Sequence, residues 1–302
     1  MADGAARRAA AQSPLRGILC MLAGGACFAV MDALVKWVSP RFSVVEIILF
    51  RSAFAFLPIL WQLRREGGRG ALKTRRFGDH IARSLFGFVS LACFIYAFGR
   101  MPLADVVAIG FSAPIFITAL SVPLLGESVG LRRWSAVLVG FAGVLVMVRP
   151  GSGMFEANAL VALVGTLLYG LAMICIRRLG GTESTGAIAF YYTLSCTVIG
   201  TAALPFAWTA PGPVDAALLT AIGLIGGCGQ LFVTAAFRIG PAAVIAPFDY
   251  ASMIYAALLG YAVWGDVPDG PLLLGAAIVV ASGLYILRRE ARQRARREHA
   301  AA

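Results

Sequence analysis

The sequence predicts an all-α membrane protein with ten transmembrane helices, arranged as two inverted five-helix repeats. Three observations predict this fold class. Of the 302 residues, 60% are apolar and only 14% are charged, whereas a soluble domain usually carries about a quarter of charged residues. Apolar runs long enough to cross a bilayer recur along the whole chain, and the two halves of the chain share a sequence repeat.

Each predicted span is a mainly apolar run of about 18 or more residues, enough for a helix to cross a hydrocarbon core about 30 Å thick. Gly and Pro inside these runs are compatible with membrane helices, and the sequence lacks the period-two alternation of a membrane barrel. The predicted spans cover residues 16–38, 43–62, 80–99, 103–124, 131–148, 158–177, 186–207, 215–238, 242–263 and 270–288.

The distribution of positive charge predicts the orientation of the chain. An even number of spans places both termini on one side, and most Lys and Arg residues then lie on that side, as the positive-inside rule requires of the cytoplasmic side. The net charge of +11 therefore reflects topology and does not predict nucleic-acid binding. We expect a multi-pass inner-membrane protein in contact with lipid, with both termini cytoplasmic. The basic tail is expected to act as an anchor, with binding of anionic lipid or a partner as the alternative.

The internal repeat relates the first half of the chain to the second. At an offset of 139 residues the following pairs coincide: Ala97/Ala236, Phe98/Phe237, Pro102/Pro241 and Gly126/Gly265; at an offset of 141 they are Gly24/Gly165, Phe28/Tyr169 and Lys36/Arg177. Each copy holds five spans, an odd number, so the second copy enters the membrane upside down. Inverted repeats recur in secondary transporters, with the substrate site between the repeats near the midplane. We predict an N-terminal tail (1–15), a first repeat (16–149), a second repeat (150–288) and a basic tail (289–302).

Asp249 and Arg51 are the main candidates for the substrate site. Asp249 lies about 10 Å deep in span nine at about 1.5 Å per residue, where a charge facing lipid costs about 3 kcal/mol or more. Pro247 predicts a kink beside it. Arg51 reaches a comparable depth in span two and stays charged. We expect Asp249 to take an ammonium group, a sulfonium group or a proton, and Arg51 a carboxylate or phosphate. A structural pair between helices is the alternative for each residue.

Other residues are secondary candidates for substrate contact. Glu46 is expected to be a gate, an alternative partner of Arg51 or a solvated residue at the cavity mouth. Tyr96, Tyr169 and Tyr250 suit an organic ligand with a flat or cationic part, although an aromatic belt at the membrane interface also explains such residues. Gln230 is either a substrate ligand or an interhelical hydrogen-bonding residue.

Three charged residues are candidates for gating or coupling. Asp32 and Lys36 stand at i, i+4 in the favourable acid-first order, so a plain surface ion pair between them is the alternative. Asp105 lies in the first turn of span four, where the helix dipole favours an acid and a capping role. Glu127 and Asp266 each follow a Gly and are expected to be turn residues.

The sequence also argues against several function classes. It contains no GxxxxGK[ST], HExxH or GxSxG motif, which gives no support for an ATP-driven pump or a hydrolytic enzyme. We place His80 and His299 in a loop and the tail, and the six cysteines lie singly, so we predict no metal site and no cofactor. Transport must then use a gradient or exchange, with a proton or a second metabolite as partner; the carboxyl group of Asp249 or Glu46 is the candidate proton carrier. The sequence does not decide whether the protein forms a homodimer.

The stretches MDALVKWV, VVEIILFRS, YAFGRMPLADVVAIGFSAPIF and IAPFDYASMIYAALLGYAVWGDVP resemble the EamA-type drug/metabolite transporter superfamily over about residues 16–290. Within it, the sequence looks closest to a branch of S-adenosylmethionine uptake carriers and riboflavin importers. The resemblance implies two EamA repeats, spans five and ten at the periphery, and a central cavity with alternating access. The S-adenosylmethionine carrier that it resembles has a basic residue at the position of Asp249, whereas an acid suits a cationic sulfonium or ammonium group.

These features together predict a secondary transporter for a small polar metabolite, zwitterionic or cationic, that is S-adenosylmethionine-like, amino-acid-like or vitamin-like. An exporter of amino acids, metallophores or toxic organic compounds is the first alternative. A non-transporting membrane scaffold or lipid scramblase is the alternative of another class; it predicts that Asp249 and Arg51 form a salt bridge with no watery cavity between them.

Overall fold

The computed structural model describes residues 14–65, 68–126, 130–148, 154–180, 182–239 and 242–301, and nearly all of them are helical. The first repeat comprises α2 (Pro14–Val38), α3 (Val44–Arg65), the short 3₁₀ helix η1 (Gly68–Leu72), α4 (Phe77–Phe98), α5 (Leu103–Gly110), α6 (Ala113–Leu125) and α7 (Leu131–Val148). The second comprises α8 (Met154–Leu179), α9 (Thr185–Ala207), α10 (Pro213–Ile239), α11 (Ala242–Ile245), η2 (Ala246–Tyr250), α12 (Ala251–Trp264) and α13 (Gly270–Ala301).

Each of the ten predicted spans corresponds to one helix or to one interrupted helix, which confirms the predicted fold class. Among the described residues, seven helical spans are long and apolar enough to cross a membrane, and residues 134–148 and 270–286 form shorter apolar helices. The helix α13 continues to Ala301, through most of the predicted basic tail. The tail residues 1–13 and Glu127 lie outside the described residues.

Spans four and nine are interrupted at corresponding places in the two repeats. The predicted kink at Pro247 is confirmed, because η2 replaces regular α-helix from Ala246 to Tyr250. The break between α5 and α6 at Phe111 and Ser112 was not predicted. Its sequence signal is Pro114, which has no N–H to donate to the carbonyl of Gly110. Both spans end at a glycine with a left-handed backbone, Gly126 (φ 68°) and Gly265 (φ 72°), a conformation that other residues rarely adopt.

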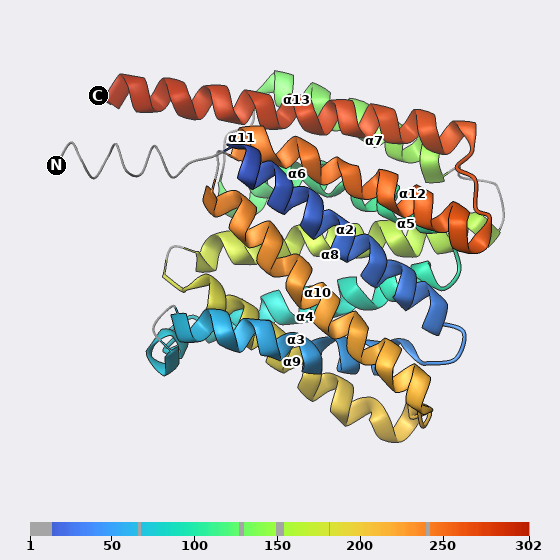
Figure 1. Ribbon diagram of the computed structural model, residues 1–302. Helices are drawn as coiled ribbons and strands as arrows, with labels where there is room; N and C mark the ends of the chain where they lie inside the picture. Colours follow the sequence, from blue (N-terminus) through green and yellow to red (C-terminus); the bar gives the residue numbers. More distant parts are fainter. Residues whose placement is uncertain are drawn as a thin grey trace.

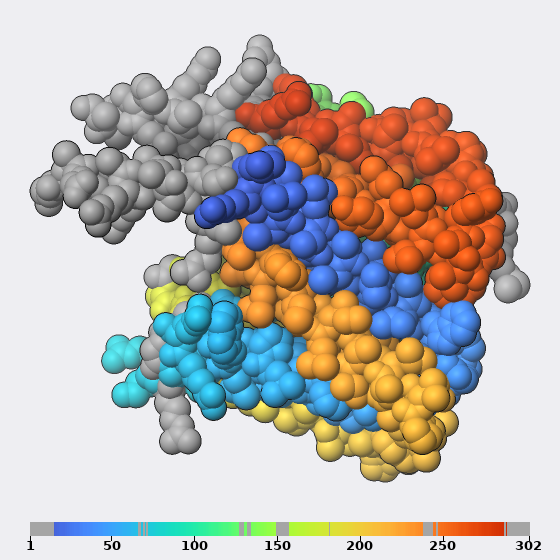
Figure 2. Space-filling view, in the orientation of Figure 1, coloured from blue at the N-terminus to red at the C-terminus, as the bar shows by residue number. Residues whose placement is uncertain are grey.

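The helices form two layers, and each layer mixes the two repeats. In one layer α12, α2, α10 and α3 lie side by side, as the face in Figure 2 shows. In the other layer α6 packs on α8, α8 on α4, and α4 on α9. The pair α3–α9 closes one edge, and the pair α7–α13 closes the other (Figure 1). Exchanging the two repeats exchanges the two layers, as inverted repeats require.

The peripheral pair α7–α13 meets through small residues. A Cβ on Gly143 would lie 2.9 Å from the carbonyl oxygen of Gly275, and a Cβ on Gly275 would lie 2.6 Å from that of Gly143. Glycine at both positions therefore lets the two backbones approach closely, which is how membrane helices commonly associate. The predicted peripheral position of spans five and ten agrees with Figure 1, where both lie along one edge.

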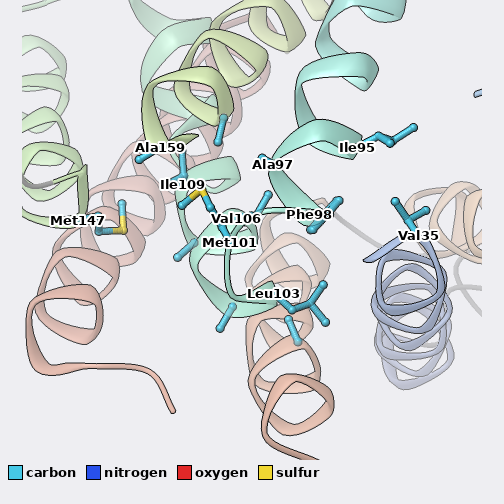
Figure 3. Packing of buried hydrophobic residues seen from close by; sticks show 14 of the residues in the cluster. Val35, Ile95, Ala97, Phe98, Met101, Leu103, Val106, Ile109, Met147 and Ala159 are labelled. Carbon is cyan, nitrogen blue, oxygen red and sulfur yellow. The ribbon is translucent and has the colours of Figure 1, made fainter. Parts of the chain in front are cut away.

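Most of the hydrophobic core lies in one half of the molecule. The start of α2 and the end of α13 lie at the same side in Figure 1, which we call the terminal face; the other side is the far face. The core cluster includes Val35, Ile95, Phe98 and Leu103 (Figure 3). Each of them lies near the far-face end of its helix. A second, smaller cluster of Met21, Ala236 and Ile245 lies toward the terminal face. The helices are thus packed most tightly at the far face.

Candidate functional site

A group of charged and tyrosine side chains lies between the two layers, and we call it the central polar cluster. It comprises Asp32 of α2, Arg51 of α3 and Asp249 of η2 from one layer, and Arg83 of α4, Tyr169 of α8 and Tyr192 of α9 from the other. Tyr192 is within electrostatic range of both Arg51 and Arg83, and Tyr169 is within range of both Arg83 and Asp249. The cluster therefore connects the two layers at the interface between the repeats.

Arg83 is the site residue that the sequence analysis missed. It lies inside α4, with its guanidinium carbon 4.0 Å from the ring centroid of Tyr192. Its Nε is buried and has no hydrogen-bond partner among the residues that the structure describes. Gly87, one turn further along α4, leaves room for this contact, because a Cβ there would lie 2.7 Å from Tyr192 Cε2. The sequence feature that could have identified it is that Arg83 is a charged residue within the apolar run 80–99.

Arg51 lies at the same interface from the other layer. Its Nε is also buried without a hydrogen-bond partner, and Asp32 lies within its electrostatic range. Ser43 and Ser184 cap α3 and α9 through the same hydrogen bond, from the backbone N–H three residues later to the serine Oγ. This equivalence sets an offset of 141 residues, at which Arg51 corresponds to Tyr192. The two side chains are thus repeat equivalents on helices that pack together.

Asp249 and Arg51 are not in contact: no hydrogen bond or ion pair joins these two described residues. Asp249 is exposed, and Tyr169 beside it is 44% exposed. Tyr250 turns away from the cluster, because its hydroxyl packs against the backbone of Gly283 in α13. Its ring lies 4.7 Å from that of Phe111 between centroids. Phe111 and Tyr250 are repeat equivalents at the offset of 139, so this contact lies on the axis between the repeats.

The alternative of an ion pair between Asp32 and Lys36 is wrong, and a role of either residue in gating or coupling stays a prediction. Lys36 Nζ lies 2.6 Å from Asp266 Oδ2 and 4.7 Å from the ring centroid of Trp264. Asp266 follows Gly265, which has a left-handed backbone, so its predicted position in a turn is confirmed. Its ion pair with Lys36 also joins the end of α2 to the end of α12 at the far face. The i, i+4 spacing of Asp32 and Lys36 did not determine the partner of Lys36, because an isolated pair of this kind stabilises a helix by only about 0.5 kcal/mol or less.

A double-mutant cycle distinguishes these two pairings. We expect the variants Lys36→Met and Asp266→Asn to show a coupling free energy of about 1 kcal/mol in unfolding, because the pair is partly shielded from solvent. The cycle of Lys36→Met with Asp32→Asn is expected to give a coupling near zero. The measurement is the free energy of unfolding in mixed micelles, and a larger coupling to Asp32 than to Asp266 would contradict the structure.

Glu46 is not a solvated mouth residue, because it is fully buried. With Ser43 it forms a capping box at the start of α3: the backbone N–H of Ser43 donates to Glu46 Oε2 (3.3 Å), and that of Glu46 donates to Ser43 Oγ (3.2 Å). Its Oε1 accepts from the backbone N–H of Thr209 at 2.9 Å. Both oxygens thus bind backbone groups and join the start of α3 to the segment after α9.

The remaining candidates lie away from the central polar cluster. Tyr96 packs against the guanidinium group of Arg100, 3.7 Å from its ring centroid, near the far face. Asp105 is buried in the first turn of α5. This is the position predicted from the sequence, where the helix dipole favours an acidic residue. Gln230 lines a pocket at the terminal face. The loop position predicted for His80 is wrong, because His80 is buried in the first turn of α4 with its Nε2 3.8 Å from Glu183 Oε2.

The central polar cluster has the charge pattern of a site for a charged organic molecule. A guanidinium Nε that is buried without a partner is costly, and it becomes favourable when an oxyanion accepts from the same guanidinium group. The cluster presents two such arginines together with two carboxylates. Tyr169 and Tyr192 add aromatic faces on which a flat or cationic group can pack.

Comparison with known proteins identifies the family of this chain. The model of the EamA-like transporter family matches residues 15–149 and 157–288, one match in each half of the chain. A riboflavin transporter of Vibrio cholerae is 30% identical over 94% of this chain and 97% of its own length. A pseudopaline exporter of Pseudomonas aeruginosa is 30% identical over 90% and 96%. An S-adenosylmethionine uptake transporter of Rickettsia prowazekii is 28% identical over 90% and 92%.

A solved crystal structure supports the fold independently. It superposes on this chain with a TM-score of 0.62 at 17% sequence identity, and the match covers 92% of this chain and 99% of the other. Three findings support the same family: the ten helical spans, the exchange of layers between the repeats, and the family match in both halves of the chain. The chain is a multi-pass membrane protein of the EamA-like transporter family, within the drug/metabolite transporter superfamily.

Proposed function

We propose that this protein is a secondary transporter for a small zwitterionic metabolite and that the central polar cluster is its substrate site. The observation that carries the proposal is the pair Arg51 and Arg83, whose buried Nε atoms lack partners at the interface between the repeats. This is where inverted-repeat carriers bind their substrates. The proposal places the protein in the inner membrane with both termini in the cytoplasm, as the positive charge distribution predicts.

The two signs of charge in the cluster define the substrate class. Arg51 and Arg83 hold a carboxylate or phosphate, and the exposed carboxylate of Asp249 holds an ammonium or sulfonium group or carries a coupled proton. Tyr169, near both Asp249 and Arg83, packs against the body of the ligand. A neutral compound would leave the charges of Arg51, Arg83 and Asp249 unpaired in the site, so it would bind more weakly than a zwitterion. Because Glu46 binds backbone groups at the far face, it has no part in the proposed site.

The proposal is tested first by binding. The purified full-length protein is heated with a panel of S-adenosylmethionine, riboflavin, free amino acids and amino-carboxylate metal chelators. A compound that binds only the folded form at a hundredfold excess over its Kd adds about 2.7 kcal/mol to stability. We expect stabilisation by zwitterionic compounds. Stabilisation by neutral compounds alone would contradict the assigned substrate class.

Transport is tested in proteoliposomes with the compounds that stabilise the protein. Uptake is measured with and without a pH gradient, and with an exchangeable metabolite inside, which separates proton coupling from exchange. We expect saturable uptake that depends on one of the two. If the protein is folded and binds the compound but nothing moves under any gradient, the proposal of a transporter fails and a membrane scaffold is favoured.

A further inference from the structure

His80, in the first turn of α4, is a buried histidine whose ring is not satisfied by its surroundings. Its side chain is 3% exposed, and both ring nitrogens, Nδ1 and Nε2, are buried with no hydrogen-bond partner in the part of the chain that the structure describes. A neutral imidazole carries one donor and one acceptor nitrogen, and leaving buried polar atoms unsatisfied is costly. Such a buried polar group requires an explanation.

A buried carboxylate faces this ring. Glu183, in the connection between α8 and α9, has a side chain that is 4% exposed, and its Oε2 lies 3.8 Å from His80 Nε2. Its Oε1 accepts a hydrogen bond of 2.8 Å from the hydroxyl of Thr74, which holds the carboxylate in place. A distance of 3.8 Å is too long for a hydrogen bond. A proton added to the ring would turn this contact into a charge-assisted hydrogen bond, which is among the strong ones.

The helix α9 connects the His80 ring to the central polar cluster. The ring centroids of Tyr191 and His80 are 4.5 Å apart, and the Tyr191 hydroxyl donates to the carbonyl oxygen of Leu72 at 2.7 Å. An aromatic ring close to a cation stabilises it. The next residue of α9, Tyr192, packs on Arg83, which follows His80 by one turn of α4. Consecutive tyrosines of one helix thus contact His80 and Arg83.

The charged groups that face His80 act on a positive ring in opposite directions. Glu183 and Asp79 lie within its electrostatic range and attract a positive charge, whereas Arg83 lies within range and repels it. Asp79 also faces Arg76 at 3.9 Å, which offsets part of its attraction. Arg83 is a member of the central polar cluster, so its charge is the one that a bound substrate changes.

An anion bound at Arg83 would shift this balance toward a protonated His80. In the proposed function, Arg83 and Arg51 hold the carboxylate or phosphate of the substrate, and that negative charge cancels the repulsion between Arg83 and a positive imidazolium ring. When one binding event strengthens another, the second strengthens the first by the same factor. A proton on His80 therefore also tightens the binding of the substrate anion.

We propose that His80, with Glu183 as its counter-ion, is the binding site of a proton that the protein takes up together with its substrate. This inference rests on the proposed function, and it leaves Asp249 free to hold the cationic group of the substrate. The proton comes from water and bonds to the unprotonated ring nitrogen, and no bond within the protein breaks. The imidazolium Nε2–H then donates to Glu183 Oε2. When the substrate leaves, the repulsion by Arg83 returns and the proton is released to water.

The proton site is tested first without substrate. The chain contains only two histidines, His80 and His299. Full-length protein labelled with ¹³C at histidine Cε1 therefore gives two ring signals, and His299→Gln assigns the remaining one to His80. The pH is varied from about 5 to 9, the range in which histidine commonly titrates. The chemical shift of the signal reports the protonation of the ring.

Two variants change the charges that face His80. We expect Arg83→Gln to make His80 bind its proton at least about threefold more tightly, and Glu183→Gln to weaken proton binding by at least about threefold, since each removes one charge within electrostatic range. If His80 does not titrate in this range in any of these proteins, or if neither variant changes its titration, the proposed proton site is overturned.

The coupling to substrate is then tested by calorimetry. The probe is the compound of the thermal panel that stabilises the protein most among those whose own charges stay constant between about pH 6 and 8. Titration in buffers of different ionisation enthalpy gives the number of protons taken up on binding. We expect proton uptake, and a Kd that falls at least about fivefold from pH 8 to pH 6. His80→Gln should bind the compound without proton uptake and with a Kd that does not depend on pH.

The His299→Gln variant is the matched control and is expected to behave as the unmodified protein does. A purely structural role of His80 would lower the melting temperature of His80→Gln but leave its proton uptake unchanged, which would overturn the proposal. Because a change at a buried ring could disturb folding, Glu183→Gln is the second variant: it keeps an acceptor for Thr74, and we expect it to take up fewer protons at the same pH.

The outcomes separate the proton site from the proposed function. If His80 titrates and responds to Arg83→Gln but no compound of the panel binds, the proton site stands and the proposed function fails. If a compound binds with proton uptake that Asp249→Asn abolishes and His80→Gln does not, the function stands and Asp249 is the proton carrier in place of His80.

Discussion

Transport by an Arg51→Gln variant is expected to fall at least about thirtyfold, because removing one charge from a buried, hydrogen-bonded ionic contact typically costs about 2 kcal/mol or more. The glutamine cannot supply the charged, forked donor that a carboxylate or phosphate needs. Arg83→Gln is expected to act in the same direction, since both Nε atoms lie at the same interface without partners. The measurement is the initial rate of uptake into proteoliposomes at matched protein content.

Arg100→Gln is the control for this experiment. Arg100 is an exposed arginine that packs on Tyr96 near the far face, so we expect its transport rate to stay within about twofold, as for a surface charge. Asp249→Asn tests the other sign of the site and is expected to reduce transport of a cationic or proton-coupled substrate. Normal uptake by both Arg51→Gln and Asp249→Asn, with folding verified, would show that the central polar cluster is not the substrate site.

The largest loss of stability is expected for Glu46→Ala. This change leaves two backbone donors without their acceptor, the N–H groups of Ser43 and Thr209, whereas the Ser43 hydroxyl keeps the carbonyl oxygen of Ala207 as an acceptor. An unsatisfied buried group costs about 1–3 kcal/mol; because Ser43 is only half-buried and Thr209 is exposed, we expect the free energy of unfolding to fall by about 1–3 kcal/mol in total. The loss is measured as a lower melting temperature of the purified protein in detergent.

Two further variants make the interpretation specific. Glu46→Gln keeps one acceptor oxygen, so its loss is expected to lie between those of Glu46→Ala and the unmodified protein. Asp79→Ala removes a partly exposed carboxylate that faces Arg76 at 3.9 Å, a contact expected to contribute less than about 1 kcal/mol. If Glu46→Ala melted like Asp79→Ala but lost transport, Glu46 would be a transport residue and the capping box would not explain it.

The spans of this protein were predictable because each is set by local composition. A run of apolar residues becomes a helix in the membrane whatever its neighbours are, since every backbone group must find its partner within the segment. The repeat followed from a few shared residues, such as Gly126 and Gly265, because a left-handed turn requires glycine in both copies. The interruption at Pro247 was visible for the same local reason.

The partners of the charged residues were not predictable in this way. Lys36 had a favourable partner four residues away in Asp32, yet it pairs with Asp266, 230 residues further along the chain. His80 was expected in a loop and Arg83 was not among the candidates, yet both lie within α4, and helix packing brings Arg83 against Tyr192. Glu46 has the sequence pattern of a capping box, but its bond to Thr209 depends on how α3 packs against α9.

The sequence by itself determined that this chain crosses a membrane ten times as two inverted halves, because hydropathy, glycine turns and the repeat are properties of short segments. Only the tertiary structure decided which charges share the interface between the layers, and in which half of the molecule most of the hydrophobic core lies. The physical reason is that a charge buried in low dielectric takes the partner that helix packing brings near it, and neither depth in a span nor spacing along the chain specifies that partner.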